Sequence, residues 1–243
     1  MVNKKIGILN LSNPVTRSVS SLVEKLKEGN NDVKVSPILH DANASPKEKA
    51  DLFNQWIKED LDFIFDVSGG DLANTTIPYI DAKAFRRSRT LFAGYSDLTC
   101  VLNRLALIRP VLLLQIANCT DPLHPCVVDR ENVLGGNIRC FLKLAQTPFF
   151  PDCEGKTLFL ESYSGNRYRI ESYFAQLSMM GVFSKIDRLI LGNFTELLDE
   201  SDGKQHLERI ARTYCRKPIE FDCRIGHQKD AYGLLLNYRK ETS

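Results

Sequence analysis

The chain has 243 residues, of which 43% are hydrophobic and 26% are charged, a composition typical of soluble globular proteins. The net charge is only +2 and the basic residues are dispersed, so we expect no nucleic-acid partner. No apolar run could span a bilayer, the N-terminus lacks a signal-like apolar segment, and seven cysteines are scattered without paired spacing. These features favour a cytoplasmic protein with reduced thiols and no membrane partner.

Strands and helices are predicted to alternate through the first half of the chain. Helices are expected between the strands, and one has a capping box of Ser45, Pro46 and Glu48 at its start. This alternation predicts a doubly wound parallel sheet, in which function collects beyond the carboxyl ends of the strands. The predicted strands cover residues 5–11, 33–39, 61–67, 91–93 and 111–116.

The character of the sequence changes near residue 118. Residues 118–132 are rich in Asp, Pro and Cys and have no clear period, which indicates a linker or a lid-like loop. Beyond them Gly135-Gly136-Asn137 opens a predicted helix. Three more strands, over 157–160, 188–192 and 219–225, alternate with helices over 168–180 and 207–214. We therefore expect an N-terminal domain (1–117), a linker (118–131) and a second, smaller α/β domain (132–243).

The segment around Ser96 reads as a strand, a tight turn and a helix. A short apolar run leads into Gly94-Tyr95-Ser96-Asp97, and a helical pattern follows it. Such a turn can present a serine hydroxyl above a helix N-terminus, as a nucleophile elbow does. The G-x-S-x-G pattern is absent, however, and Ser96 or Asp97 could equally be an ordinary helix N-cap.

Ser96, Glu161 and His227 each stand just past or at the end of a predicted strand. A serine hydroxyl needs an imidazole to accept its proton, and a carboxylate fixes the imidazole tautomer, so these three types form the set required for acyl transfer. Spacing alone does not separate this hypothesis from a solvated carboxylate and a surface-loop histidine.

Other polar groups carry weaker signals. Cys119, His124 and Cys126 lack a fourth ligand with zinc-site spacing, so no metal and no cofactor are expected. Arg167 and Arg169, close to Glu161 in sequence, are candidates for holding a substrate carboxylate through the guanidinium fork.

The motifs taken together resemble the murein LD-carboxypeptidase family, which also includes the microcin C self-immunity peptidases. The resemblance covers nearly the whole chain in the order of the family. It is carried by residues 6–12, by Ser68-Gly69-Gly70-Asp71 with 77–81, by Gly94-Tyr95-Ser96-Asp97, by Leu134-Gly135-Gly136-Asn137 with Thr147-Pro148, by 155–161, 168–170, 181–183 and 191–194, and by Gly226-His227.

This resemblance implies a role for each candidate residue. Ser96 would be the nucleophile, His227 the general base and acid, and Glu161 the partner that orients His227. The N–H groups of Gly70 and Asp97 would form the oxyanion hole. Gly69, in the same turn as Gly70, and Arg169, on the guanidinium argument above, are our candidates for contacting substrate.

The resemblance also implies the reaction and the partners. The expected activity is cleavage of the L,D-bond before the terminal D-alanine of murein tetrapeptide, in peptidoglycan recycling, by a cytoplasmic homodimer. Alternatives are a hydrolase of peptidyl-nucleotide conjugates and a shortened relative that binds a peptide without cleaving it.

The sequence departs from the family in several places. The chain is short, with losses between 114 and 132 and between 195 and 219, and Ser68 stands where the family usually has Arg. The "HGP"-like segment is not evident near Gln115, and Leu234-Leu235-Leu236-Asn237 replaces "LPLG". These differences bear on specificity more than on the three candidate catalytic residues.

Overall fold

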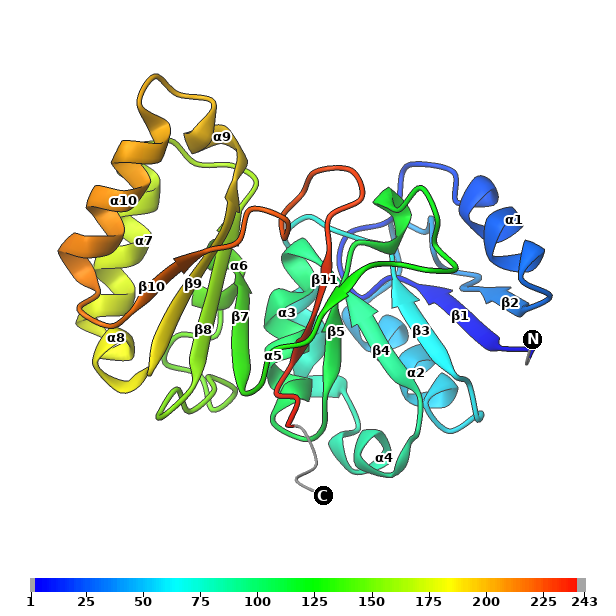
Figure 1. Cartoon of the computed structure of the whole chain (residues 1–243). Helices are drawn as coiled ribbons and strands as arrows, with labels where there is room; N and C mark the ends of the chain where they lie inside the picture. The colour runs from blue at the N-terminus through cyan, green and yellow to red at the C-terminus, as the bar shows by residue number, and fades with distance from the viewer. Residues whose placement is uncertain (1–2, 240–243) are drawn as a thin grey trace.

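Two β-sheets organise residues 3–239, which are the residues described by the computed structural model (Figure 1). The larger sheet has seven strands in the order β2-β1-β3-β4-β5-β11-β6, all parallel to their neighbours except β11, which runs antiparallel to β5. Their bounds are β1 Lys5–Leu9, β2 Asp32–Val35, β3 Phe63–Asp66, β4 Leu91–Gly94, β5 Val111–Leu113, β6 Val127–Val128 and β11 Gly233–Leu236.

Helices cover both faces of this sheet, as a doubly wound fold requires. One core contains Leu22 and Leu26 of α1, and the other contains Phe53 and Trp56 of α2. Ser45 and Glu48 form the expected capping box at the start of α2. The helical segments of this part are α1 Ser20–Glu28, α2 Pro46–Trp56, α3 Ala73–Thr76, η1 Ile77–Tyr79, α4 Ala82–Arg87, η2 Ser96–Leu98, α5 Thr99–Ala106 and η3 Ile116–Asn118.

The second sheet has four parallel strands in the order β10-β9-β8-β7. Together the two sheets confirm the expected class, a doubly wound α/β unit with a second, smaller α/β unit. The strands are β7 Val133–Asn137, β8 Thr157–Ser162, β9 Arg188–Phe194 and β10 Ile219–Phe221. The helices are α6 Ile138–Leu142, α7 Arg167–Met179, α8 Val182–Lys185, α9 Thr195–Leu198 and α10 Gly203–Tyr214.

Helix α5 joins the two sheets (Figure 1). It contacts β5 of the larger sheet and β7 of the smaller one, and nearly all of its residues are buried. The core that contains Val101 and Leu105 of α5 also includes Leu134 and Phe159 from the second sheet. Because α5 follows Ser96 directly, packing between the sheets also positions the Ser96 turn.

Three elements differ from the sequence predictions. Gly135-Gly136 lies within β7, whereas the predicted helix does begin at Ile138, as α6 with Asn137 as its N-cap. A side chain at Gly135 (φ +108°) would place its Cβ 2.0 Å from the Phe159 carbonyl oxygen. Glycine is needed there for close backbone approach within a strand. The predicted linker contributes β6, and residues 219–225 are not the last strand, because β11 returns the chain to the larger sheet. The division into 1–117, 118–131 and 132–243 stays a prediction, and β11 crosses it.

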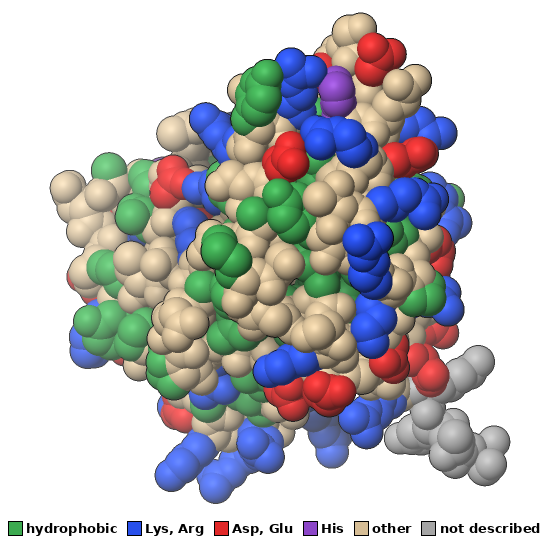
Figure 2. All heavy atoms as spheres, turned by 90° about the vertical axis from the view of Figure 1, so that its left-hand side faces the viewer, with side chains coloured by type: hydrophobic (Ala, Val, Ile, Leu, Met, Phe, Trp, Pro, Cys, Tyr) green, Lys and Arg blue, Asp and Glu red, His purple; other side chains and the backbone are tan. Residues whose placement is uncertain are grey.

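The surface carries both signs of charge. On the side that includes α7 and α10, basic and acidic side chains are interspersed (Figure 2), and Arg209 of α10 pairs with Glu171 of α7 at 3.2 Å. None of the helices within residues 3–239 has the length and apolar character needed to cross a membrane.

Candidate active site

The turn after β4 holds Ser96 in a strained conformation. Tyr95 is extended, Ser96 has φ +56°, and the Leu98 N–H donates to the Tyr95 carbonyl at 3.0 Å as η2 begins. A non-glycine residue in this left-handed region costs about 1–3 kcal/mol and persists only where the surroundings enforce it. A strand, a strained serine and a helix in succession form the geometry of a nucleophile elbow.

His227 and Glu161 lie 66 positions apart in sequence but are in direct contact. The His227 Nδ1 is 2.7 Å from Glu161 Oε2, and the Glu161 side chain is 0% exposed. Because a carboxylate only accepts hydrogen bonds, this contact requires a proton on Nδ1, and in the neutral imidazole Nε2 then presents a lone pair. Nε2 is buried and has no hydrogen-bond partner among the described residues.

Two tyrosines hold the His227 ring. The ring centroid of Tyr95 lies 5.0 Å away in an edge-on arrangement, and that of Tyr163 lies 5.1 Å away. Burial, and then the nearby Glu161 carboxylate, raises the pKa of the Tyr95 phenol well above its usual value, so Tyr95 stays neutral. Since Tyr95 precedes Ser96, this contact places the imidazole beside the Ser96 turn, although no Ser96–His227 hydrogen bond is formed within the described chain.

The Gly69-Gly70 turn lies beyond the neighbouring strand, β3. Gly70 has φ +114°, and a Cβ there would lie 2.3 Å from Asn13 Cγ, so no other residue fits. The Asn13 N–H donates to the Gly69 carbonyl at 3.3 Å, and the Asp71 N–H donates to Asn13 Oδ1 at 3.1 Å. The N–H groups of Gly70 and Asp97 donate to no other described residue.

Buried titratable groups lie close to these two turns. The Asp66 carboxylate accepts from the Leu11 N–H at 2.6 Å and from the Ser68 N–H at 2.8 Å, yet burial raises its pKa to about 7. Lys49 donates to the Ser12 carbonyl at 2.6 Å, and burial lowers its pKa. The Ser12 hydroxyl in turn donates to the Asp97 carboxylate at 2.6 Å, so the loop after β1, which also contacts the Gly69-Gly70 turn, is linked to the turn that carries Ser96.

A cavity of about 430 Å³ opens in front of Ser96. Arg17 is the one cationic side chain of its lining, and it donates a hydrogen bond of 3.5 Å to Asn118 Oδ1. The lining consists of Asn13, Pro14, Val15, Thr16, Arg17, Asp66, Val67, Ser68, Gly69, Tyr95, Ser96, Gln115, Ile116 and Ala117.

Sequence reasoning did not single out Arg17, Lys143 or Arg139, which lie close to these turns. For Arg17 the available signal was its position in the segment after β1, because function collects beyond the carboxyl ends of parallel strands. Arg169, which was singled out, lies in the first turn of α7, outside the cavity lining, and its role stays a prediction.

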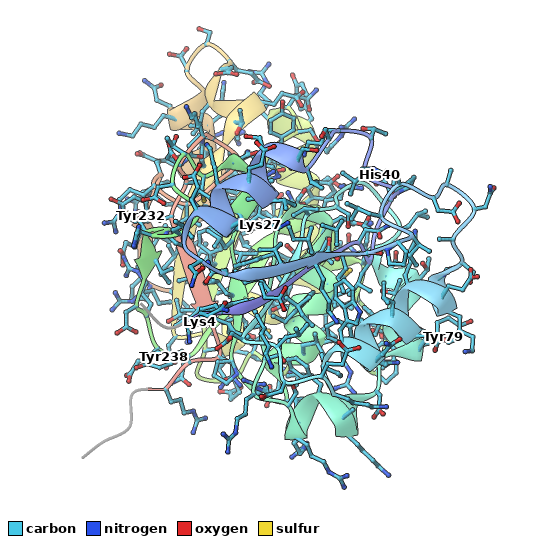
Figure 3. All side chains as sticks on the ribbon, turned by 90° about the vertical axis from the view of Figure 1, so that its right-hand side faces the viewer. Lys4, Lys27, His40, Tyr79, Tyr232 and Tyr238 are labelled. Atoms are coloured by element: carbon cyan, nitrogen blue, oxygen red, sulfur yellow. The ribbon has the colours of Figure 1, made fainter. Side chains whose placement is uncertain are left out.

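None of the remaining histidines lines the cavity in front of Ser96. His40, labelled in Figure 3, lies between β2 and α2 and contacts the Val15 carbonyl at 2.5 Å. His206 contacts Arg167 at 3.1 Å. His124 pairs with Asp121 at 3.0 Å. Within residues 3–239, no group of three His, Cys, Asp or Glu side chains could hold a metal ion.

Comparisons with known sequences find one family. Residues 6–109 match the LD-carboxypeptidase N-terminal domain, and residues 131–241 match the LD-carboxypeptidase C-terminal domain. A Vibrio cholerae protein named as a carboxypeptidase is 20% identical over 235 residues, which covers 73% of this chain and 70% of that protein.

Comparisons with solved structures agree on the fold. The muramoyltetrapeptide carboxypeptidase of Oxalobacter formigenes superposes with a TM-score of 0.80 at 22% identity, covering 96% of this chain and 92% of that chain. The wild-type microcin C7 self-immunity protein MccF gives 0.81 at 18% identity, covering 97% and 92%. An MccF-like protein from Bacillus anthracis gives 0.79 at 15% identity, covering 98% and 92%.

Proposed function

The chain belongs to the LD-carboxypeptidase family, and on this basis we propose that it is a serine peptidase that cleaves an amide bond near the carboxyl end of a small peptide. The observation that carries the proposal is the 2.7 Å contact between His227 Nδ1 and Glu161, which leaves Nε2 unpartnered beside the strained Ser96 turn.

Each residue has one role in the proposed reaction. His227 Nε2 accepts the proton of Ser96 Oγ as Oγ attacks the carbonyl carbon, and Glu161 stabilises the imidazolium. The N–H groups of Gly70 and Asp97 donate to the oxyanion. The imidazolium then gives its proton to the leaving amine as the C–N bond breaks, which leaves an acyl ester on Ser96. Water, deprotonated by the same imidazole, hydrolyses the ester and restores the serine.

The cavity supports a substrate with a free carboxylate. Arg17 shares the cavity with Ser96, and none of the described carboxylates forms an ion pair with it. A guanidinium binds a carboxylate through two parallel hydrogen bonds, which fixes direction as well as position. We therefore propose that Arg17 holds the terminal carboxylate of the substrate, while Gly69 borders the scissile amide.

The proposed substrate is murein tetrapeptide, cut at the L,D-bond before its terminal D-alanine, in peptidoglycan recycling. The fold is shared equally with MccF, which has been solved with aspartyl sulfamoyl adenosine. A peptidyl-nucleotide conjugate is therefore the alternative substrate, and both compounds belong in one assay. A peptide-binding relative without activity is the remaining alternative.

The test compares the wild-type protein with Ser96→Ala and with Ser201→Ala, a matched exposed serine outside the site. D-alanine release from the tetrapeptide and cleavage of the conjugate are followed by mass spectrometry. We expect Ser96→Ala to lose at least about three orders of magnitude in turnover with an unchanged melting temperature, and Ser201→Ala to remain active. Full activity of Ser96→Ala would refute the mechanism, and no cleavage by the wild type would favour the binding protein.

We also propose a location and an assembly state, the cytoplasm and a homodimer. All seven cysteines are unpaired, as in proteins of a reducing cytoplasm. The homodimer rests on resemblance, and light scattering of the purified protein measures it directly.

A further inference from the structure

Two basic residues of helix α6 reach from the second sheet into the turns that flank Ser96. Lys143, the C-cap of α6, forms an ion pair with Asp97 and donates to the Asp71 carbonyl at 2.7 Å. Arg139, one turn earlier, donates to the Gly70 carbonyl at 2.9 Å and forms an ion pair with Asp71. Both cations thus contact the Gly-Gly turn, and one of them also contacts the residue after the serine.

The Asp97 carboxylate is fully engaged in this arrangement. Its Oδ2 accepts from the Ser12 hydroxyl at 2.6 Å and from the Ala73 N–H at 2.8 Å, and its Oδ1 accepts from Lys143. The Asp97 side chain is 0% exposed and that of Lys143 is 17% exposed. A buried carboxylate requires such a partner, because an unpaired charge in this environment is strongly unfavourable.

Hydrogen bonds fix the peptide groups of the Gly69-Gly70 turn around the Gly70 N–H, which itself has no partner within the described chain. Asn13 bonds the Gly69 carbonyl and the Asp71 N–H, Arg139 bonds the Gly70 carbonyl, and Lys143 bonds the Asp71 carbonyl. The Gly70 N–H, in the middle of this set, donates to no described residue. Its direction is therefore set by contacts that do not occupy it.

We propose that Lys143 and Arg139 are positioning residues that hold the N–H groups of Gly70 and Asp97 at the separation needed to bind one oxyanion. This inference rests on the proposed function of that site. Lys143 links the loop that carries the Gly70 N–H to the loop that carries the Asp97 N–H, because it contacts both. Arg139 fixes the peptide group that follows the Gly70 N–H, since it bonds the Gly70 carbonyl. Neither cation lines the cavity in front of Ser96, so on this proposal both act on the transition state through backbone geometry.

A double substitution distinguishes the proposed positioning role of Lys143 from a purely structural role. Lys143→Met leaves the Asp97 charge buried and unpaired, so we expect it to lower both the melting temperature and kcat. Asp97→Asn combined with Lys143→Met removes both charges and restores the melting temperature. On our proposal kcat stays low in the double variant, because the contact with the Asp71 carbonyl is still missing. A structural role predicts that kcat returns with stability.

Arg139→Ala is the second, independent variant. Its ion pair is exposed, at 38% for Arg139 and 68% for Asp71, and contributes little to stability. We expect an unchanged melting temperature, a kcat lowered about tenfold to a hundredfold, and a KM within about threefold. Arg139→Lys should recover part of kcat. Arg188→Ala, which breaks the exposed Arg188–Glu220 pair far from the site, is the matched control and should leave kcat unchanged.

A boronate analogue of the substrate gives a readout that stability does not affect. Its affinity should fall by the same factor as kcat in Arg139→Ala, whereas that of the product peptide should not change. Wild-type kcat and boronate affinity in Arg139→Ala, with Ser96→Ala inactive, would overturn this inference and leave the proposed function standing. An active Ser96→Ala would overturn the proposed function itself.

Discussion

The two adjacent glycines of the Gly69-Gly70 turn should respond in opposite ways to a single methyl group. A Cβ at Gly69 meets no atom within 4 Å, and Gly69 borders the cavity in front of Ser96. A Cβ at Gly70 lies 2.3 Å from Asn13 Cγ, and Gly70 has φ +114°. Gly69→Ala therefore changes the space offered to substrate, whereas Gly70→Ala changes the folded backbone.

The cost of Gly70→Ala can be worked out from these contacts. The unfavourable φ costs about 1–3 kcal/mol, and displacing Asn13 breaks its 3.1 Å bond to the Asp71 N–H, which contributes about 0.5–1.5 kcal/mol. The sum, about 1.5–4.5 kcal/mol, lowers the melting temperature of a chain of this size by roughly 10 °C. For Gly69→Ala we expect no such loss, but an increase in KM as the methyl group enters the cavity.

The assay pairs a thermal melt with steady-state kinetics on the peptide substrate. Gly70→Ala should have a lower melting temperature than the wild type for the steric reason above. It should also have a lower kcat, because the Gly70 N–H is a proposed oxyanion donor. Gly69→Ala should melt with the wild type and lose kcat/KM through KM. Equal melting temperatures for Gly70→Ala and the wild type would refute the steric reasoning. A wild-type KM for Gly69→Ala would place the substrate elsewhere.

Two further predictions concern charge. Arg17→Ala should raise KM about tenfold or more for a substrate with a free carboxylate but not for its amide. Arg169→Ala, outside the cavity lining, is the comparison. Equal effects of the two substitutions on KM would reject the assignment of Arg17. Native Asp66, with its pKa raised to about 7, retains a proton that the unfolded chain releases near pH 4, so its contribution to the free energy of unfolding falls as pH rises from about 4 to 7. Denaturant titrations of the wild type and Asp66→Asn should therefore diverge in slope against pH over that window, and parallel curves would contradict it.

Local signals in the sequence predicted much of this fold. The Ser45–Glu48 capping box and the strand–turn–helix pattern around Ser96 depend on neighbouring residues and can be recognised without tertiary contacts. Strand β11 was missed because its four residues are identified as a strand only by their pairing with β5, more than a hundred positions away. Strand β7 was missed because two glycines in its centre resemble a turn.

The candidate site was predictable to a different degree. Motif resemblance indicated Ser96, Glu161 and His227, and the structure brings the last two into contact while Tyr95 connects them to the Ser96 turn. Lys143 and Arg139 could not be anticipated, because isolated basic residues on a short helix usually face solvent. Their partners Asp71 and Asp97 follow the paired strands β3 and β4 of the larger sheet, and α6 reaches them only after the two sheets have packed together.

The course of the chain after β10 has a consequence for biosynthesis. The loop that carries His227 is anchored at one end by β10 in the small sheet and at the other by β11, inserted between β5 and β6. A ribosome releases the serine and the glutamate well before this closing strand. The growing polypeptide therefore acquires its proposed base last. A proteolytic cut just ahead of Gly233 would separate the His227 loop from β11, and we expect it to lower activity without altering any reacting group.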